Sequence, residues 1–282
     1  MAPFFFIMTE LINSYAKLNL NLLVGPARQD GYHPIQSVFQ EISLHDVIHI
    51  SWVSSSSVTL VLSSSGIEMP TDESNILVAV FEGLKDKLRH KYTLHVEKNI
   101  PLGSGMGGAS SNAAAFIKAI NRIEQLGLTD AELCHLGAQY GADIPFFIVG
   151  GSMKVEGIGE KLSPVPSMSG TRYVIMYPGL QCSTATIYSQ FDTKVRTALS
   201  DSYSINAPYL GPNDLQDVCL SAYPAMRAIY DTLTALTHRK WRMTGSGSTF
   251  FMPLSEQDNA TTICNAIKAE YPNSLVQEVT AL

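Results

Sequence analysis

The segment Pro101-Leu-Gly-Ser-Gly-Met-Gly-Gly-Ala-Ser-Ser111 decides which folds this chain can adopt. It places four glycines within six residues, from Gly103 to Gly108, and a stretch with helical periodicity follows it. Such small side chains let backbone N–H groups approach a ligand closely, and the positive end of the helix dipole favours an anion. A tight turn alone would need fewer glycines. We therefore interpret the segment as a phosphate-binding loop.

Two other glycine motifs compete with this interpretation. Gly103 to Gly108 matches G-x-G-x-x-G, the dinucleotide fingerprint, which requires a second strand that ends in an acid about 20 residues downstream. The acid at that distance, Glu124, lies inside a predicted helix, and 129–140 reads as another helix. A Walker A loop is excluded because no G-K-[ST] occurs, and the protein-kinase motifs H-R-D and D-F-G are absent as well.

Periodicity on both sides of the loop predicts mixed strands and helices. In 16–22 apolar and polar residues alternate, which predicts a half-buried strand with Lys17, Asn19 and Asn21 on its polar face. Thr129 and Glu132 form a capping-box pattern. The other predicted strands are 47–53, 57–62, 92–96, 173–177 and 242–252, and the predicted helices are 75–89, 113–127, 129–141, 223–236 and 260–270.

The chain of 282 residues exceeds the usual size of one domain, so we expect two. The stretch 157–170 is rich in Gly, Pro and Ser, and it favours a division into domains at 1–160 and 161–282. The composition, with 45% hydrophobic and 16% charged residues, is that of a globular protein, and the predicted strands and helices after residue 170 suggest a compact α+β unit.

Charge, cysteine and hydropathy patterns exclude several classes of protein. A net charge of −6 argues against binding of nucleic acid. Four widely separated cysteines indicate reduced, buried thiols and neither a zinc site nor disulfides. No uncharged apolar run reaches the roughly 18 residues that cross a bilayer, and the opening Met1 to Met8 lacks the features of a signal peptide. We expect a cytoplasmic protein that starts naturally at Met8.

Five separated motifs resemble the GHMP kinase superfamily and, within it, the 4-diphosphocytidyl-2-C-methyl-D-erythritol kinases of the non-mevalonate isoprenoid pathway. The motifs are Ala16-Lys-Leu-Asn-Leu20, Asp30-Gly-Tyr-His33, the loop continued as Asn112-Ala-Ala114, Gly141-Ala-Asp-Ile-Pro-Phe-Phe147 and Thr244-Gly-Ser-Gly-Ser-Thr249. This sequence departs from the family pattern at Tyr15, Asn21, Met106 and Ala109.

The resemblance implies a two-domain α+β fold, similar in its N-terminal half to the second domain of ribosomal protein S5 and ferredoxin-like in its C-terminal half. It also implies ATP-dependent phosphorylation of the 2-hydroxyl of a cytidine diphosphate-linked polyol, usually with Mg²⁺. No carboxylate is assigned as a metal ligand. By resemblance, the ATP-binding residues are Pro101, Leu102, Gly103, Ser104, Gly105, Met106, Gly107, Gly108, Ala109, Ser110 and Ser111.

The catalytic residues implied by the resemblance are Lys17 and Asp143. Asp143 lies between Gly141 and Pro145, which we place at the end of a helix, where the dipole disfavours an acid. It serves as general base by resemblance, although a cap of the next turn is an equally good structural reason. Lys17 would neutralise charge on the transferred group, unless it is an ordinary solvated lysine.

The substrate residues implied by the resemblance are Asn19, Tyr32, His33, Thr184 and Tyr188. Asn19 would bind the polyol. The turn at Asp30-Gly31 presents Tyr32 and His33 together for the cytosine, and Tyr188 supplies a second stacking face near Thr184. Ordinary packing remains an alternative for both tyrosines.

Other readings remain open for the C-terminal glycine motif and for the function as a whole. A plain hairpin turn is the alternative for the loop at Gly245 and Gly247. For the whole chain, the alternatives are another GHMP kinase, acting on mevalonate, homoserine or a sugar, and a non-catalytic RNA-binding protein with an S5-like half.

Overall fold

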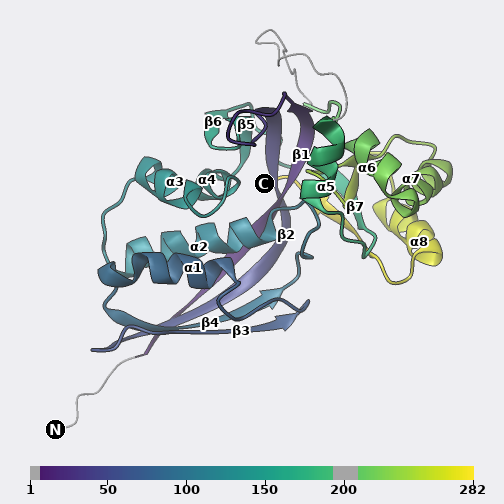
Figure 1. Cartoon of the computed structure of the whole chain (residues 1–282). Coiled ribbons are helices and arrows are strands. Elements are labelled where there is room, and N and C mark those ends of the chain that lie inside the picture. Colours follow the sequence, from purple (N-terminus) through teal and green to yellow (C-terminus); the bar gives the residue numbers. More distant parts are fainter. Residues whose placement is uncertain (1–6, 193–208) are drawn as a thin grey trace. The chain divides into compact units, whose positions relative to one another are not determined.

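The computed structural model describes residues 7–192 and 209–282. Helices and strands are mixed along the chain, as the sequence predicts (Figure 1). The strands are β1 Met8–Val24, β2 Ile35–Ser54, β3 Leu60–Gly66, β4 His90–Lys98, β5 Ser152–Gly157, β6 Lys161–Pro164, β7 Arg172–Tyr177, β8 Arg242–Met243, β9 Phe250–Pro253 and β10 Leu275–Thr280. The helices are α1 Ile76–Leu84, α2 Gly108–Ile123, α3 Asp130–Ala138, α4 Ile144–Val149, α5 Thr184–Asp192, α6 Gln216–Ala222, α7 Pro224–Thr237 and α8 Ala260–Glu270, with a 3₁₀ turn at Lys85–Lys87.

The chain packs into two compact units that interleave along the sequence. The first comprises Met1–Ala16, Leu44–Leu102 and Gly107–Val149, and the second comprises Lys17–Ser43, Gly103–Met106 and Gly150–Leu282. The long strands β1 and β2 therefore contribute residues to both units. The division into domains at 1–160 and 161–282 stays a prediction, because close packing does not show which ranges fold on their own.

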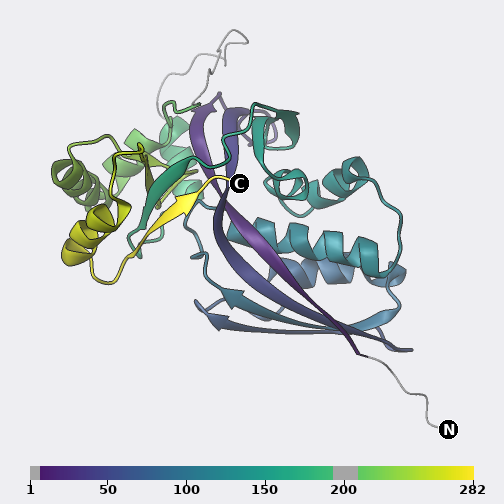
Figure 2. The ribbon, with the colours of Figure 1, turned by 180° about the vertical axis from the view of Figure 1, so that it is seen from behind.

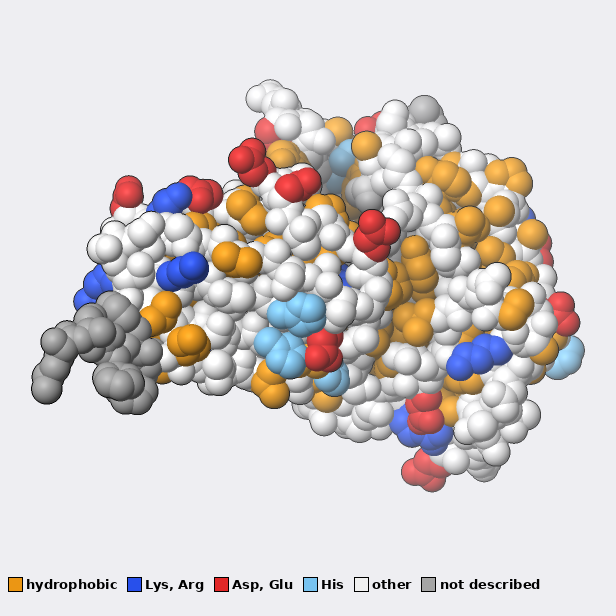
Figure 3. Space-filling view, turned by 90° about the horizontal axis from the view of Figure 1, so that it is seen from below, with side chains coloured by type: hydrophobic (Ala, Val, Ile, Leu, Met, Phe, Trp, Pro, Cys, Tyr) orange, Lys and Arg blue, Asp and Glu red, His pale blue; other side chains and the backbone are white. Residues whose placement is uncertain are grey.

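The first unit is built on strands β3, β4 and part of β2, with α1 and α2 covering one face of the sheet (Figures 1 and 2). β3 pairs with β4 in parallel, and β2 pairs with β4 antiparallel. Alanines let α2 pack closely, and Phe116, Ile117 and Ile120 of that helix are buried. His49 and His95 are directly opposed across β2 and β4, with ring centroids 5.9 Å apart. Histidine side chains gather on the face of the molecule that Figure 3 shows.

Local capping signals fix where two helices of this unit, α1 and α3, begin. Asn75 caps α1 by accepting the N–H of Leu77 at 2.8 Å. The predicted capping box is confirmed at the start of α3, where Thr129 and Glu132 satisfy each other's backbone N–H groups. The capping box is a local signal, so the sequence alone predicts it.

The second unit contains a four-stranded antiparallel sheet in the order β10-β7-β9-β8, against which α8 packs. The sequence predicted one strand over 242–252. The structure instead has β8 and β9, joined by the glycine-rich loop 244–249 into an antiparallel hairpin. Left-handed backbone at Gly245, with φ of 57°, breaks the strand. The hairpin reading of this loop is therefore confirmed.

Two predictions about burial were wrong. The strand over 16–22 is buried on both faces, and its polar residues Lys17, Asn19 and Asn21 are no more than 3% exposed. Their polar face is covered because residues distant in sequence hydrogen-bond to it. Among the cysteines, all of which are free thiols, Cys134 is only half-buried.

In the portions that the structure describes, no helix combines the length and apolarity needed to span a membrane.

Candidate functional site

The glycine loop places three left-handed glycines, at alternate positions, directly before a helix. Gly103, Gly105 and Gly107 have φ values of 65°, 78° and 74°. Gly107 is also the N-cap of α2 and, being glycine, offers no side chain to the first-turn N–H groups. Unpaired N–H groups at a helix N-terminus, together with the helix dipole, attract a phosphate. The geometry supports the prediction that this loop holds ATP phosphates.

The loop is anchored by backbone contacts within the second unit. The N–H of Lys17 donates to the Met106 carbonyl at 3.0 Å, and the N–H of Thr249 donates to the Ser104 carbonyl at 3.1 Å. The side chains of Ser104 and Met106 are buried, so these two residues offer a ligand their backbone alone. At the other end, Ala109 is exposed, and its methyl group meets solvent at the start of α2.

Lys17 and Asn19 form a buried polar cluster with Thr244. Lys17 Nζ donates to Asn19 Oδ1 and lies 4.6 Å from the centroid of the Phe39 ring. Asn19 Oδ1 also lies 3.1 Å from Thr244 Oγ1, and Asn19 Nδ2 donates to Ser37 Oγ at 3.2 Å. Protein groups therefore engage both polar atoms of the Asn19 amide, and its contact with the substrate stays a prediction.

Asp143 lies immediately before α4, which begins at Ile144. The sequence argument placed it at the end of a helix, where the dipole disfavours an acid. That placement was wrong, because α3 already ends at Ala138 and a separate short helix starts after Asp143. An acid at a helix start is favoured by the dipole. Its role as general base stays a prediction, as does its pairing with Lys17, which belongs to the other unit.

The loop 244–249 is held by an asparagine that the sequence reasoning missed. Asn213 Nδ2 donates to the carbonyls of Met243 and Gly245, at 2.7 and 2.8 Å. Thr184 joins the same loop, since its hydroxyl lies 2.7 Å from that of Ser246. The run Gly211-Pro-Asn-Asp214 signals a turn, yet a turn signal does not reveal which distant loop the turn supports.

Of the predicted base-binding residues, His33 and Tyr188 pack against each other, and Tyr32 is exposed. The rings of His33 and Tyr188 are 4.9 Å apart at 38°, whereas Tyr32 is 59% exposed and His33 is buried. That Tyr32 and His33 contact the same base stays a prediction. His33 Nδ1 lies 2.9 Å from the Gly25 carbonyl, and its Nε2 lies 3.4 Å from Asp192, so protein partners orient this ring.

Within 7–192 and 209–282, no group of three or more His, Cys, Asp or Glu side chains could hold a metal ion. Mg²⁺ in nucleotide sites usually binds one or two carboxylates together with phosphate oxygens and water. A site of that kind needs no protein cluster.

Two family models match this sequence. The GHMP kinases N terminal domain matches residues 75–151, which include the glycine loop and Asp143. The GHMP kinases C terminal model matches residues 197–273, which include the loop 244–249.

Curated relatives agree over most of the chain. A 4-diphosphocytidyl-2-C-methyl-D-erythritol kinase of Caldicellulosiruptor bescii is 32% identical over 269 residues, covering 91% of this chain and 93% of the relative. A protein of the same name from Delftia acidovorans is 36% identical and covers 86% and 85%.

Solved structures confirm the two-domain α+β fold. A crystal structure of a 4-(cytidine 5'-diphospho)-2C-methyl-D-erythritol kinase superimposes with a TM-score of 0.78 at 28% identity, covering 96% of this chain and 99% of the other. Homoserine kinase from Cytophaga hutchinsonii gives 0.71 at 14% identity, over 97% and 94%, and shares the fold alone.

Proposed function

Because the chain belongs to the GHMP kinases and, among them, to the family of 4-diphosphocytidyl-2-C-methyl-D-erythritol kinases, we propose that it transfers the γ-phosphoryl group of ATP to the 2-hydroxyl of that cytidylyl polyol. The observation that carries the proposal is the glycine loop, whose three left-handed glycines lead directly into the uncapped start of α2.

The loop residues Pro101 to Ser111 would hold the phosphates of ATP. Backbone N–H groups can follow the phosphate oxygens closely there because the glycines carry no side chains. Mg²⁺ bound to those phosphates would neutralise developing charge. The protein's own contribution at this end of the site is to bind and orient the donor.

Asp143 and Lys17 would act on the group in transfer. The substrate's 2-hydroxyl oxygen forms the new bond to the γ-phosphorus, and its proton passes to the Asp143 carboxylate. The bond from the γ-phosphorus to the bridging oxygen breaks, and ADP leaves. Lys17, fixed by Asn19 and stacked on Phe39, would stabilise negative charge on the transferred group.

His33, Tyr188 and Tyr32 would recognise cytosine, and Thr184 lies next to the loop 244–249 on the same unit. An aromatic ring gives a base a stacking surface, and the ordered His33 ring keeps Tyr188 in place. The partner is therefore a small molecule, and a cytoplasmic location stays a prediction.

A coupled ADP-release assay tests the proposal across four acceptors: the cytidylyl methylerythritol, mevalonate, homoserine and galactose. We expect turnover with the first alone. Turnover with another acceptor would assign a different GHMP activity. Absence of ADP release with all four, together with retention of labelled RNA on nitrocellulose at physiological salt, would favour the RNA-binding alternative.

A further inference from the structure

One carboxylate of the first unit stands at a core position of a strand. In β2, the alternating residues Leu44, Ile48 and Ile50 face the core, and Asp46 takes the position between the first two. Asp46 is 0% exposed. Taking a carboxylate out of water is costly unless hydrogen bonds and charges compensate it, so its partners indicate what it does.

Asp46 accepts four hydrogen bonds from residues that flank or belong to the glycine loop and its helix. Its Oδ1 accepts the backbone N–H groups of Asn99 at 2.7 Å and Ile100 at 2.8 Å, the two residues that lead into Pro101. Its Oδ2 accepts from Lys98 Nζ at 2.5 Å and from Asn112 Nδ2 at 2.9 Å. One carboxylate thus connects the strand that enters the loop with the helix that leaves it.

The connection extends to the last residue of the loop. Asn112 Nδ2 also lies 2.9 Å from Ser14 Oγ, and Ser14 Oγ lies 2.7 Å from Ser111 Oγ. The packing around the start of α2 is tight. A β-carbon added at Gly108 would lie 2.9 Å from both Lys98 Nζ and Ile100 Cγ2. Lys98 and Ile100 therefore pack closely against the N-terminus of α2.

We propose that Asp46 is a positioning residue for the nucleotide: it fixes both ends of the glycine loop so that the N–H groups of the loop and of α2 point at the phosphates. The proposal rests on the proposed function. A buried ion pair contributes little net stability compared with a well-packed apolar pair. An apolar pair could not fix the positions of the loop ends, because only a hydrogen-bond acceptor can bind the N–H groups of Asn99 and Ile100.

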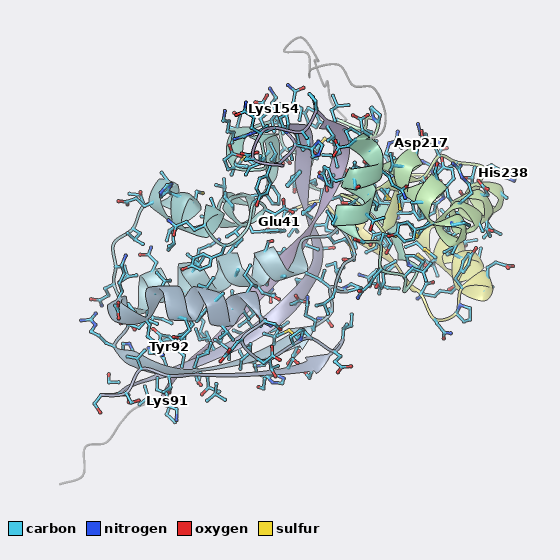
Figure 4. The ribbon with its side chains drawn as sticks, viewed as in Figure 1. Glu41, Lys91, Tyr92, Lys154, Asp217 and His238 are labelled. Carbon is cyan, nitrogen blue, oxygen red and sulfur yellow. The ribbon has the colours of Figure 1, made fainter. Side chains whose placement is uncertain are left out.

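The same helix offers a matched control at its other end. Glu124, the C-cap of α2, has a side chain that is 0% exposed, like that of Asp46. Its carboxylate accepts the Arg89 N–H at 2.9 Å and the Tyr92 hydroxyl at 2.6 Å, with Tyr92 on β4 at the far end from the loop (Figure 4). Loss of Glu124 disturbs a buried carboxylate network of the same unit without touching the loop.

The test compares D46N and E124Q by equilibrium binding of Mg-ATP, by KM and kcat, and by thermal unfolding. The D46N change would turn an amide N–H₂ toward Lys98 or Asn112. In metal sites, losing a residue that orients a ligand costs roughly 10- to 100-fold in affinity, and we expect D46N to weaken ATP binding by that order. At saturating ATP, kcat stays near the wild-type value. E124Q lowers the melting temperature comparably but leaves ATP affinity unchanged.

Wild-type ATP affinity in D46N, or equal weakening in both variants, would overturn the proposal. Should D46N fail to fold, N112A removes one contact without stranding a charge, and an unchanged ATP affinity in N112A would also overturn it. A wild-type protein that binds ATP but does not phosphorylate the cytidylyl substrate would sink the proposed function, while the affinities still decide on Asp46. A wild-type protein that binds no ATP would overturn both.

Discussion

The backbone N–H of Asn19 donates to Thr244 Oγ1 at 2.9 Å, although 225 residues separate them. The Thr244 hydroxyl can in turn donate to Asn19 Oδ1 at 3.1 Å or to the Gly105 carbonyl at 3.2 Å. Asn19 Oδ1 also accepts from Lys17 Nζ. A single buried hydroxyl therefore links the strand of the candidate catalytic lysine to both glycine loops.

Thr244→Val should destabilise the protein and lower kcat. Valine has the same shape but leaves the Asn19 N–H buried without a partner, which costs about 1 to 3 kcal/mol. Thr249→Val is the matched control, because Thr249 is equally buried in the same hairpin and its hydroxyl has no hydrogen-bond partner among the described residues. Chemical denaturation should show a loss for Thr244→Val and no loss for Thr249→Val. Equal effects would contradict the role of Thr244.

Gly105→Ala should weaken ATP binding. Gly105 has φ of 78°, and an added β-carbon would lie 2.9 Å from the Gly247 carbonyl and closer still to that of Thr244. Gly127→Ala provides the control, since Gly127 has a similar φ of 68° and no described atom would come within 4 Å of its added β-carbon. Left-handed strain costs both variants about 1 to 2 kcal/mol. Titration with ATP should separate them, and identical affinities would mean that the close approach of the two loops is not needed.

Much of the fold follows from local patterns in the sequence. The capping box at Thr129 and the range of α8 both match the sequence predictions, because a cap and an apolar stripe lie within a few residues of each other. The glycine loop was recognisable for the same reason. Its small residues are consecutive in the sequence, so no distant partner is needed to recognise it.

What the sequence could not reveal depends on distant partners. Lys17 and Asn19 alternate with apolar residues, so they read as solvent-facing, yet Thr244 covers that face. The buried contacts of Asp46 were missed although a signal was present, since an acid occupies a core position between Leu44 and Ile48. Its partners near residue 100 become visible only once β2 and β4 are paired.

Asp143→Asn and Lys17→Met should each lower kcat while leaving ATP binding largely intact, because both residues are proposed to act on the transferred group. Loss of a general base typically costs roughly 10²- to 10⁴-fold. Asp130→Asn, which changes an exposed acid in the first turn of α3, is the control. Steady-state kinetics with saturating ATP distinguish the variants. Near-normal turnover in Asp143→Asn would remove this residue from the mechanism.

The stability of the first unit should depend on pH through Glu124. Burial alone would raise the pKa of this carboxyl, but hydrogen bonds from Tyr92, the Arg89 N–H and His90 outweigh burial and lower it. A lowered pKa means that the stabilisation is complete above the unfolded value of about 4.3 and is lost as pH falls through the folded pKa.

Glu124→Gln should therefore cost roughly 1 to 3 kcal/mol at neutral pH and should flatten the loss of stability below about pH 4. Urea denaturation between about pH 7 and pH 3 measures both effects. Glu82→Gln, at an exposed position paired with Lys85, should change neither. Parallel profiles for wild type and Glu124→Gln would show that other carboxylates control the acid transition.

Recognition of cytosine should depend on the ring of Tyr188. Because His33 packs at 4.9 Å from that ring, Tyr188 is oriented before any substrate arrives, and little entropy remains to be lost on stacking. A base stacked on an aromatic ring gains roughly 1 to 3 kcal/mol, so Tyr188→Ala should raise KM for the cytidylyl substrate about 5- to 150-fold. Tyr32→Ala should act in the same direction.

Tyr188→Phe keeps the ring and should retain the wild-type KM, and KM for ATP should stay unchanged in all three variants. Normal substrate KM in both alanine variants, or equal use of unmodified methylerythritol phosphate by the wild type, would show that the cytidine is not recognised by stacking.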